Sequence, residues 1–147
     1  MSAATESAGS QTDYQHVVLV VDDSSANLTM LTDYLEDSGF STLTASNGKD
    51  ALQQALQKHP DLILLDVVMP GLDGFETCRQ LKAQQVLQEI PVIFMTALSS
   101  TEDKIKGFQA GAVDYITKPF RQEEILARVN THLQIRDLTR SLQEANQ

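Results

Sequence analysis

The stretch DLILLDVVMPG, residues 61–71, decides the fold. Its segment 62–65 is a continuous apolar run, which is typical of a parallel strand buried on both faces of a sheet. Asp66 ends this run, and Pro70-Gly71 then predicts a turn. A carboxylate at the carboxyl end of a buried strand lies where open α/β sheets usually bind their ligands. Within this stretch alone, an aspartate that only accepts hydrogen bonds from loop amides is an equally good interpretation, so the rest of the chain has to decide.

The composition is that of one globular domain. The chain has 147 residues, of which 41% are hydrophobic and 21% are charged. Its formal net charge of −9 disfavours direct binding to nucleic acids or anionic membranes, because their phosphates would be repelled. No apolar run approaches the roughly 20 residues that cross a bilayer, and no secretory signal is visible. Cys78 is the only cysteine and is predicted to be a small core residue, so we expect a cytoplasmic protein without an internal disulfide.

Five apolar segments alternate with five helical patterns along the chain. We expect strands over 16–21, 40–45, 62–65, 90–96 and 112–116, and helices over 25–38, 47–59, 74–83, 101–111 and from 121 to near 147. Such alternation with short connections predicts an α/β fold, a parallel sheet with helices on both faces. Five strands favour the flavodoxin-like, doubly wound order 2-1-3-4-5. We predict a disordered tail over 1–13, one domain over 14–133, and an extension of the last helix over 134–147.

Polar side chains follow four of these strands at the same edge of the predicted sheet. In the order 2-1-3-4-5, the switch point lies between the first and third strands. Asp22 and Asp23 end the first strand and Asp66 ends the third, so we expect three carboxylates to converge there. Thr96 and Lys118 follow the fourth and fifth strands. Adjacent carboxylates after a buried strand are costly unless a cation binds between them.

The three carboxylates predict a magnesium site, because they cannot all stay ionised without a cation. Mg²⁺ prefers oxygen ligands and keeps several waters. Asp23 and Asp66 could bind it directly and Asp22 through water, which leaves positions open for a phosphoryl group. A carboxylate beside Mg²⁺ can act as a nucleophile and form an aspartyl phosphate. The Thr96 hydroxyl and the Lys118 ammonium would cover the other phosphoryl oxygens.

Four motifs in this order resemble the receiver domain of two-component response regulators. They are VVDD at 20–23, LLDVVMPGLDG at 64–74, MTA at 95–97 and KPF at 118–120, each at the end of a predicted strand. The resemblance covers residues 16–133. One such motif alone would be weak, whereas four in the right order are specific.

The resemblance implies a role for each motif residue. Asp66 is expected to accept a phosphoryl group from a phosphohistidine of a histidine kinase or a histidine phosphotransfer protein. Mg²⁺, or Mn²⁺ in its place, would be held by Asp22, Asp23, Asp66 and the backbone carbonyl of Val68. Lys118 would contact a phosphoryl oxygen, and the peptide bond that follows it is expected to be cis.

The resemblance also implies a conformational switch rather than an enzyme, although the domain would assist its own phosphotransfer and dephosphorylation. Phosphorylation is expected to move Thr96 and Tyr115, and thereby the surface of the fourth helix, fifth strand and fifth helix. That surface would bind partners or form a homodimer. The family positions that influence water attack are Val68 and Leu98 here. Neither side chain can orient a water by hydrogen bonding, so we expect self-dephosphorylation to be slow, over many minutes or longer.

The last helix is longer than a receiver domain needs. Leu126, Val129 and Leu133 are expected to pack on the sheet. Beyond them, a short heptad-like pattern with spacings of three, four and three residues comprises Ile135, Leu138, Leu142 and Ala145. This overhang could fold back onto the domain, fray, form a homodimer or lead into a coiled coil. We expect either a receiver excised from a larger protein or a single domain that acts through contacts.

Each of these residues, considered alone, also has a purely structural interpretation. Asp22 and Asp23 could be an acidic pair stabilised at a helix N-terminus. Thr96 could be an ordinary strand-end hydroxyl, Lys118 a solvated cation, and Tyr115 half-buried packing at the sheet edge. The three histidines lack metal-ligand spacing and are predicted to be ordinary surface or edge residues: His16, His59 and His132.

Other functional classes compete with a signalling switch. A Mg²⁺-dependent phosphotransferase or phosphatase of the haloacid-dehalogenase type also forms an aspartyl phosphate, but needs a second aspartate where this chain has Val68. A phosphate-independent interaction domain would keep the fold, yet every motif residue is present. A dinucleotide-binding domain can be set aside, because no Gly-x-Gly-x-x-Gly motif follows the first strand.

Overall fold

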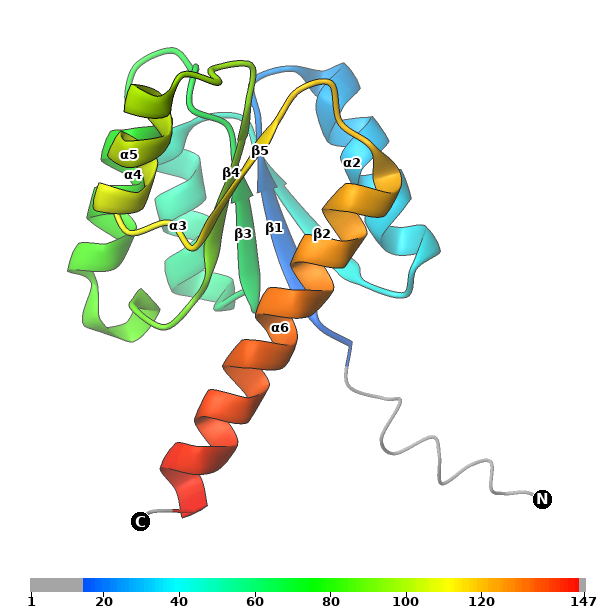
Figure 1. The fold of residues 1–147 in the computed structure, drawn as a ribbon, viewed down its shortest axis with the longest axis vertical. Helices are drawn as coiled ribbons and strands as arrows, with labels where there is room; N and C mark the ends of the chain where they lie inside the picture. The colour runs from blue at the N-terminus through cyan, green and yellow to red at the C-terminus, as the bar shows by residue number, and fades with distance from the viewer. Residues whose placement is uncertain (1–14, 146–147) are drawn as a thin grey trace.

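The computed structural model describes residues 15–145, which form one parallel sheet with helices on both faces (Figure 1). The elements are β1 (Val17–Val21), α2 (Ser25–Asp37), β2 (Ser41–Ala45), α3 (Gly48–Lys58), β3 (Leu62–Leu65), α4 (Gly74–Ala83), the short 3-10 helix η1 (Gln85–Leu87), β4 (Val92–Thr96), α5 (Thr101–Gln109), β5 (Asp114–Thr117) and α6 (Gln122–Ala145). The strand order β2-β1-β3-β4-β5 confirms the predicted doubly wound topology. The tail predicted over 1–13 lies outside the described residues.

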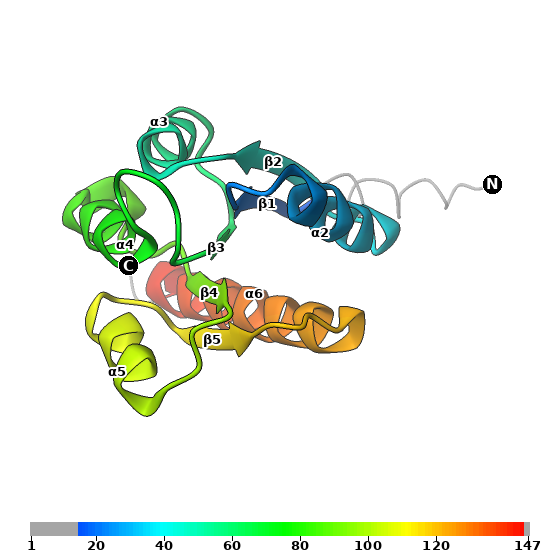
Figure 2. The same ribbon diagram turned by 90° about the horizontal axis from the view of Figure 1, so that it is seen from above.

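The central strands are apolar throughout because both faces of the sheet are covered. In β3, Ile63 and Leu65 pack in the core formed with α3 and α4, whereas Leu62 and Leu64 pack in the core formed with α2 and α6. Seen from above, α2 and α6 cover one face of the sheet, and α3, α4 and α5 cover the other (Figure 2). All four β3 side chains are at most 1% exposed, so the strand that precedes Asp66 is fixed on both sides.

Helix caps appear where short polar side chains precede a helical pattern. The Ser24 hydroxyl accepts a hydrogen bond from the backbone N–H of Asn27, and the side chain of Asn47 accepts one from that of Asp50. Both caps lie at positions predicted from the sequence, and each satisfies one of the free N–H groups of a first helical turn. α2 and α3 therefore begin close to where β1 and β2 end.

Two connections differ from the prediction. The segment expected to be a polar loop before β4 contains η1, which buries Leu87 to 1% exposure. β5 begins at Asp114 rather than at residue 112, because Gly111 adopts a left-handed φ of 113° and Ala112 donates its backbone N–H to the carbonyl of Gly107. These two residues close α5 and are therefore unavailable to the strand.

α6 packs on the sheet through Val129 and Leu133, as predicted, and through Ile125, which the prediction missed. Ile125, Val129 and Leu133 are at most 2% exposed, whereas Leu126 is only partly buried against the same core. Towards the C-terminus the helix extends past the sheet (Figure 1). There the three large apolar side chains of the heptad-like pattern are 52%, 65% and 66% exposed: Ile135, Leu138 and Leu142. Among residues 15–145, no helix is both long and apolar enough to cross a membrane.

Candidate functional site

Three carboxylates meet at the carboxyl ends of β1 and β3. These strands pair in parallel with Val21 opposite Leu65, so the residues that follow them, Asp22 and Asp66, become neighbours. One oxygen from each of Asp22, Asp23 and Asp66 lies within 4.8 Å of the others. Asp22 and Asp66 are buried, whereas Asp23 is exposed. The juxtaposition expected from the strand order is therefore present, and it is open to solvent on the side of Asp23.

The surroundings of Asp66 disfavour its negative charge. The residue is only 4% exposed. Burial raises the pKa of Asp66 above 3.8, and the nearby charge of Asp22 raises this pKa further. Lys118 and the backbone N–H groups of Val67 and Val68 act in the opposite direction, and the N–H of Val67 lies 2.8 Å from Asp66 Oδ1. An ionised Asp66 would therefore gain from an additional cation.

Lys118 supplies one cation to the cluster. Its Nζ lies 3.5 Å from Asp66 Oδ2 and 3.9 Å from Asp22 Oδ2. The backbone N–H of Lys118 donates to the carbonyl of Thr96, which ties the loop after β5 to the end of β4. The Lys118–Pro119 peptide bond is cis, as expected. One ammonium group faces two buried carboxylates, so the local charge stays negative.

Gly74 allows α4 to begin directly against the strand that carries Asp66. A Cβ atom at this position would overlap the Asp66 carbonyl oxygen and would lie 2.6 Å from the Val67 Cα. Because both of these are backbone atoms, they cannot move aside cheaply. The backbone N–H of Gly74 also donates to the carbonyl of Val67 over 2.8 Å. Gly74 therefore fixes the shape of the loop that follows Asp66.

Thr96 and Tyr115 are joined through the backbone of Leu98. The Thr96 side chain is fully buried, and its Oγ1 accepts a weak hydrogen bond from the Leu98 N–H over 3.4 Å. The Tyr115 hydroxyl donates to the Leu98 carbonyl over 2.7 Å. Burial, together with the charges of Asp103 and Asp66, raises the pKa of Tyr115 to about 12, so this hydroxyl stays protonated. A movement of the β4–α5 loop would therefore act on both side chains.

Two groups of interacting residues escaped the sequence analysis. Asn27 donates its side-chain amide to Asp22 Oδ2 over 3.2 Å, one turn into α2. At the start of β5, Asp114 accepts hydrogen bonds from Arg128 of α6 over 2.9 Å and lies 3.0 Å from His132 of the same helix. Burial would raise the pKa of Asp114, but these two partners outweigh burial and hold it below 3.8.

Two of the histidines have partners that the sequence did not predict. His132 is partly buried and lies 3.0 Å from Asp114 of the edge strand β5. His16 lies 3.1 Å from Asp137 of α6 and joins the start of the sheet to the last helix. No sequence pattern marks these pairs, because their members are 18 and 121 residues apart.

Comparisons with known proteins agree with this geometry. The family model described as "Response regulator receiver domain" matches residues 18–130. The chain is 46% identical over 116 residues to the alkaline phosphatase synthesis transcriptional regulatory protein PhoP of Bacillus subtilis, covering 79% of this chain and 48% of that protein. It is 43% identical to protein PilH of Pseudomonas aeruginosa, covering 79% of this chain and 96% of that protein.

Solved structures give the same result. The chemotaxis protein CheY4 of Vibrio cholerae superimposes with a TM-score of 0.77 and 33% identity, covering 80% of this chain and 98% of that one. The chain spans about half the length of the first curated relatives that it matches, 48% and 50%. The family match extends from β1 into α6 and includes every residue of the acidic cluster. The chain therefore belongs to the response regulator receiver domain family.

Proposed function

We propose that this chain is a phosphorylation-driven switch in which Asp66 accepts a phosphoryl group from a phosphohistidine of a histidine kinase or phosphotransfer protein. The observation that carries the proposal is the convergence of Asp66 with two further carboxylates and Lys118 at one edge of the sheet. In the transfer, the phosphorus–nitrogen bond of the phosphohistidine breaks and a phosphorus–oxygen bond to the Asp66 carboxylate forms. The imidazole leaves with the electron pair and takes up a proton.

The donor set fits a hard divalent cation. The three carboxylates supply the oxygen ligands that Mg²⁺ or Mn²⁺ prefers, and the exposed Asp23 leaves the cluster open on one side. Asp22, Asp23, Asp66 and the Val68 carbonyl would hold the ion. When bound, the ion would offset the negative charge that gathers on the transferred phosphoryl group. Lys118, at 3.5 Å from Asp66 Oδ2, would neutralise one phosphoryl oxygen from the other side.

The switch would operate through Leu98. For the Thr96 hydroxyl to donate to a phosphoryl oxygen on Asp66, its O–H has to point towards Asp66, and this reorientation would disturb the weak hydrogen bond that Thr96 Oγ1 accepts from the Leu98 N–H. The Leu98 carbonyl holds Tyr115, so a shift of the loop would release or redirect the ring. Tyr115 lies on β5, between α5 and α6. The surface formed by these three elements would change with phosphorylation.

That surface carries the apolar side chains expected of a docking site. Ile105 and Phe108 of α5 are 49% and 50% exposed, and Val113, just before β5, is 42% exposed. A partner protein or a second copy of the chain would bind there. A homodimer through the exposed end of α6 is an additional prediction. Analytical ultracentrifugation of the protein with and without phosphorylation would test both dimer arrangements. The cytoplasmic location stays a prediction.

The phosphoryl group on Asp66 is expected to be long-lived. Val68 is 59% exposed beside the phosphoacceptor, and Leu98 is partly buried. Neither side chain offers a donor or an acceptor to an attacking water. Phosphate loss from the purified phosphorylated protein should take many minutes or longer. A half-life of seconds would contradict this assignment, and Val68→Asn should shorten the lifetime.

Incubation with acetyl phosphate and Mg²⁺, followed by intact-mass measurement, tests the proposal as a whole. The parent should gain the mass of one phosphoryl group, and Asp66→Asn should gain none. An unchanged parent mass would favour a phosphate-independent interaction domain that keeps only the fold. Equal uptake by parent and variant would exclude Asp66 as the acceptor.

A further inference from the structure

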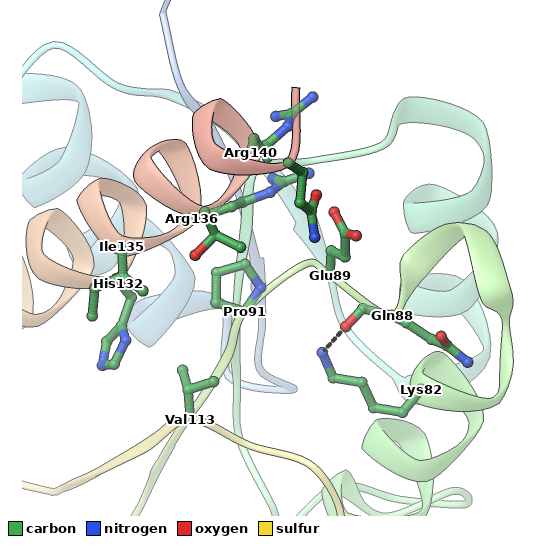
Figure 3. A pocket seen from close by; sticks show the side chains of 11 residues that line it. Lys82, Gln88, Glu89, Pro91, Val113, His132, Ile135, Arg136 and Arg140 are labelled. Carbon is green, nitrogen blue, oxygen red and sulfur yellow. Dashed lines mark hydrogen bonds between the residues drawn. The ribbon is translucent and has the colours of Figure 1, made fainter. Parts of the chain in front are cut away.

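A cavity of about 220 Å³ lies between α6 and the connection from α4 to β4 (Figure 3). We call it the α6 cavity, and it is lined by Lys82, Glu89, Pro91, Ile135, Arg136 and Arg140, among others. Pro91 directly precedes β4, so the cavity lies at the amino ends of the strands. The acidic cluster lies at their carboxyl ends. The two sites share no residue.

The lining of the α6 cavity is positively charged, in contrast to the chain as a whole. It contains Lys82, Arg136 and Arg140 against the single carboxylate of Glu89, while the chain carries a net charge of −9. Among residues 15–145, Arg140 forms no ion pair. Lys82 donates hydrogen bonds to the carbonyls of Gln88 and Ile90, and no described carboxylate pairs with it. Arg136 pairs with the Asp61 carboxylate over 3.5 Å, so the positive charge left without a paired carboxylate among the described residues is that of Lys82 and Arg140.

The guanidinium group of Arg136 has an unsatisfied hydrogen-bond donor. Its Nη1 donates to the Asp61 carbonyl over 2.8 Å and lies 3.5 Å from Asp61 Oδ1, while its Nε is buried and has no hydrogen-bond partner among the described residues. A buried guanidinium N–H without a partner is unfavourable, and because this atom is closed off from solvent, an oxyanion in the cavity would offset the cost through its charge rather than by a direct hydrogen bond. Burial lowers the pKa of Lys82, and the charge of Arg136 lowers it further, so the two cations are near enough to repel each other. An anion between them would relieve that repulsion.

An apolar wall completes the cavity. Pro91 is buried, while Val113 and Ile135 are 42% and 52% exposed. In Figure 3, Pro91 and Val113 lie between the α6 residues on one side and Lys82 on the other. The volume is below the roughly 300–1,000 Å³ of sites that hold drug-sized ligands, so the occupant has to be small. A small molecule with one anionic end and one apolar end matches both walls.

We propose that the α6 cavity binds a small phosphomonoester or phosphonate with a compact apolar body. The oxyanion would lie against Arg136 and Arg140, whose planar guanidinium groups suit phosphoryl oxygens, and the apolar body would lie on Pro91, Val113 and Ile135. Such a ligand bridges α6 and the α4–β4 connection, so binding also stabilises the docking of α6. The proposal does not depend on phosphorylation of Asp66, and the two can fail separately.

Titration of the 147-residue chain with phenylphosphonate, followed by amide shifts in two-dimensional NMR, tests the proposal. The carbon–phosphorus bond prevents transfer to Asp66, and EDTA removes metal from the acidic cluster. Saturable shifts are expected at Glu89, Val113 and Arg140. Inorganic phosphate, which lacks the apolar body, should bind more weakly.

Three variants locate the binding. Arg140→Gln should weaken binding at least about fivefold, since it removes a charge-assisted hydrogen bond at a partly exposed site. Arg79→Gln, which removes the same charge from the exposed face of α4, should leave the affinity unchanged. Glu89→Gln should tighten binding by removing the competing carboxylate. Four outcomes would each overturn the assignment. The amide shifts could be confined to the residues around Asp66, or no saturable shift could occur at the cavity. Alternatively, Arg140→Gln could bind phenylphosphonate as tightly as the parent does, or inorganic phosphate could bind as tightly as phenylphosphonate.

Discussion

Replacing Asp66 by asparagine should make the metal-free protein more stable. The Asp66 carboxylate is 4% exposed and lies within 4.8 Å of those of Asp22 and Asp23. At that distance, and with an effective dielectric constant of about 20, one like-charge pair costs about 3.5 kcal/mol. The Lys118 ammonium at 3.5 Å offsets this cost by about 4.7 kcal/mol in the same approximation. These two charges alone leave a net attraction of about 1 kcal/mol, and a burial cost of about 3 kcal/mol, the largest influence on this carboxylate, turns it into a net cost of about 2 kcal/mol.

Urea unfolding in EDTA near neutral pH measures this difference. With a slope of about 2 kcal/mol/M, the midpoint of Asp66→Asn should exceed that of the parent by about 1 M. Asparagine keeps the size of the side chain and the oxygen that accepts from the Val67 N–H over 2.8 Å. With Mg²⁺ at a hundred times its dissociation constant, the parent should gain about 2.7 kcal/mol and the variant much less. The order of stabilities should therefore reverse.

The pH dependence has a definite sign. Burial and the charge of Asp22 raise the pKa of Asp66 above 3.8, so the folded protein binds this proton more tightly than the unfolded chain does. The parent should gain stability as the pH falls through that raised pKa, and the advantage of Asp66→Asn should shrink in the same window. A variant less stable than the parent in EDTA, or an advantage independent of pH, would refute the reasoning.

Four further variants test β5 and α6. Asp114→Asn should lower the free energy of unfolding by about 1–3 kcal/mol at neutral pH. This loss should disappear as the pH falls through the lowered pKa of Asp114, and urea titrations at several pH values would measure it. Tyr115→Phe should lower the free energy of unfolding by about 0.5–1.5 kcal/mol, because the hydrogen bond to the Leu98 carbonyl is lost, and thermal unfolding would measure this. In a pH titration of the parent, the absorbance change that Tyr115→Phe removes should have its midpoint near pH 12. Ile125→Ala should cost about 2–5 kcal/mol and Leu126→Ala clearly less; equal losses by denaturant unfolding would contradict the observed helix phase.

Most of the fold follows from local sequence. The apolar runs before Asp22 and Asp66 predict strands buried on both faces, and the strand-order rule then brings the two carboxylates together. Residues such as Asn47 predict helix starts because their side chains compete for the free N–H groups of a first turn. The acidic cluster and Lys118 were therefore predictable from topology, whereas their chemical roles stay predictions.

The remainder depends on packing that a sequence does not encode locally. Val129 and Leu133 of α6 were predicted correctly, but Ile125 was missed in favour of Leu126 because both side chains are apolar and only contact with the sheet separates them. The Asp114 network joins β5 to α6 across 14 and 18 residues without any periodic signal. The α6 cavity likewise arises where three separate segments meet, and no motif marks it.

The identity of the phosphorylated residue is the most direct test of the proposed switch. After incubation with acetyl phosphate and Mg²⁺, borohydride reduces an aspartyl phosphate to homoserine, which peptide mass spectrometry then locates. Homoserine should be found at position 66 alone, and its yield should fall sharply in Lys118→Ala. Homoserine at position 22 or 23, or phosphoryl uptake without any modification at position 66, would contradict the proposal that this cluster activates Asp66.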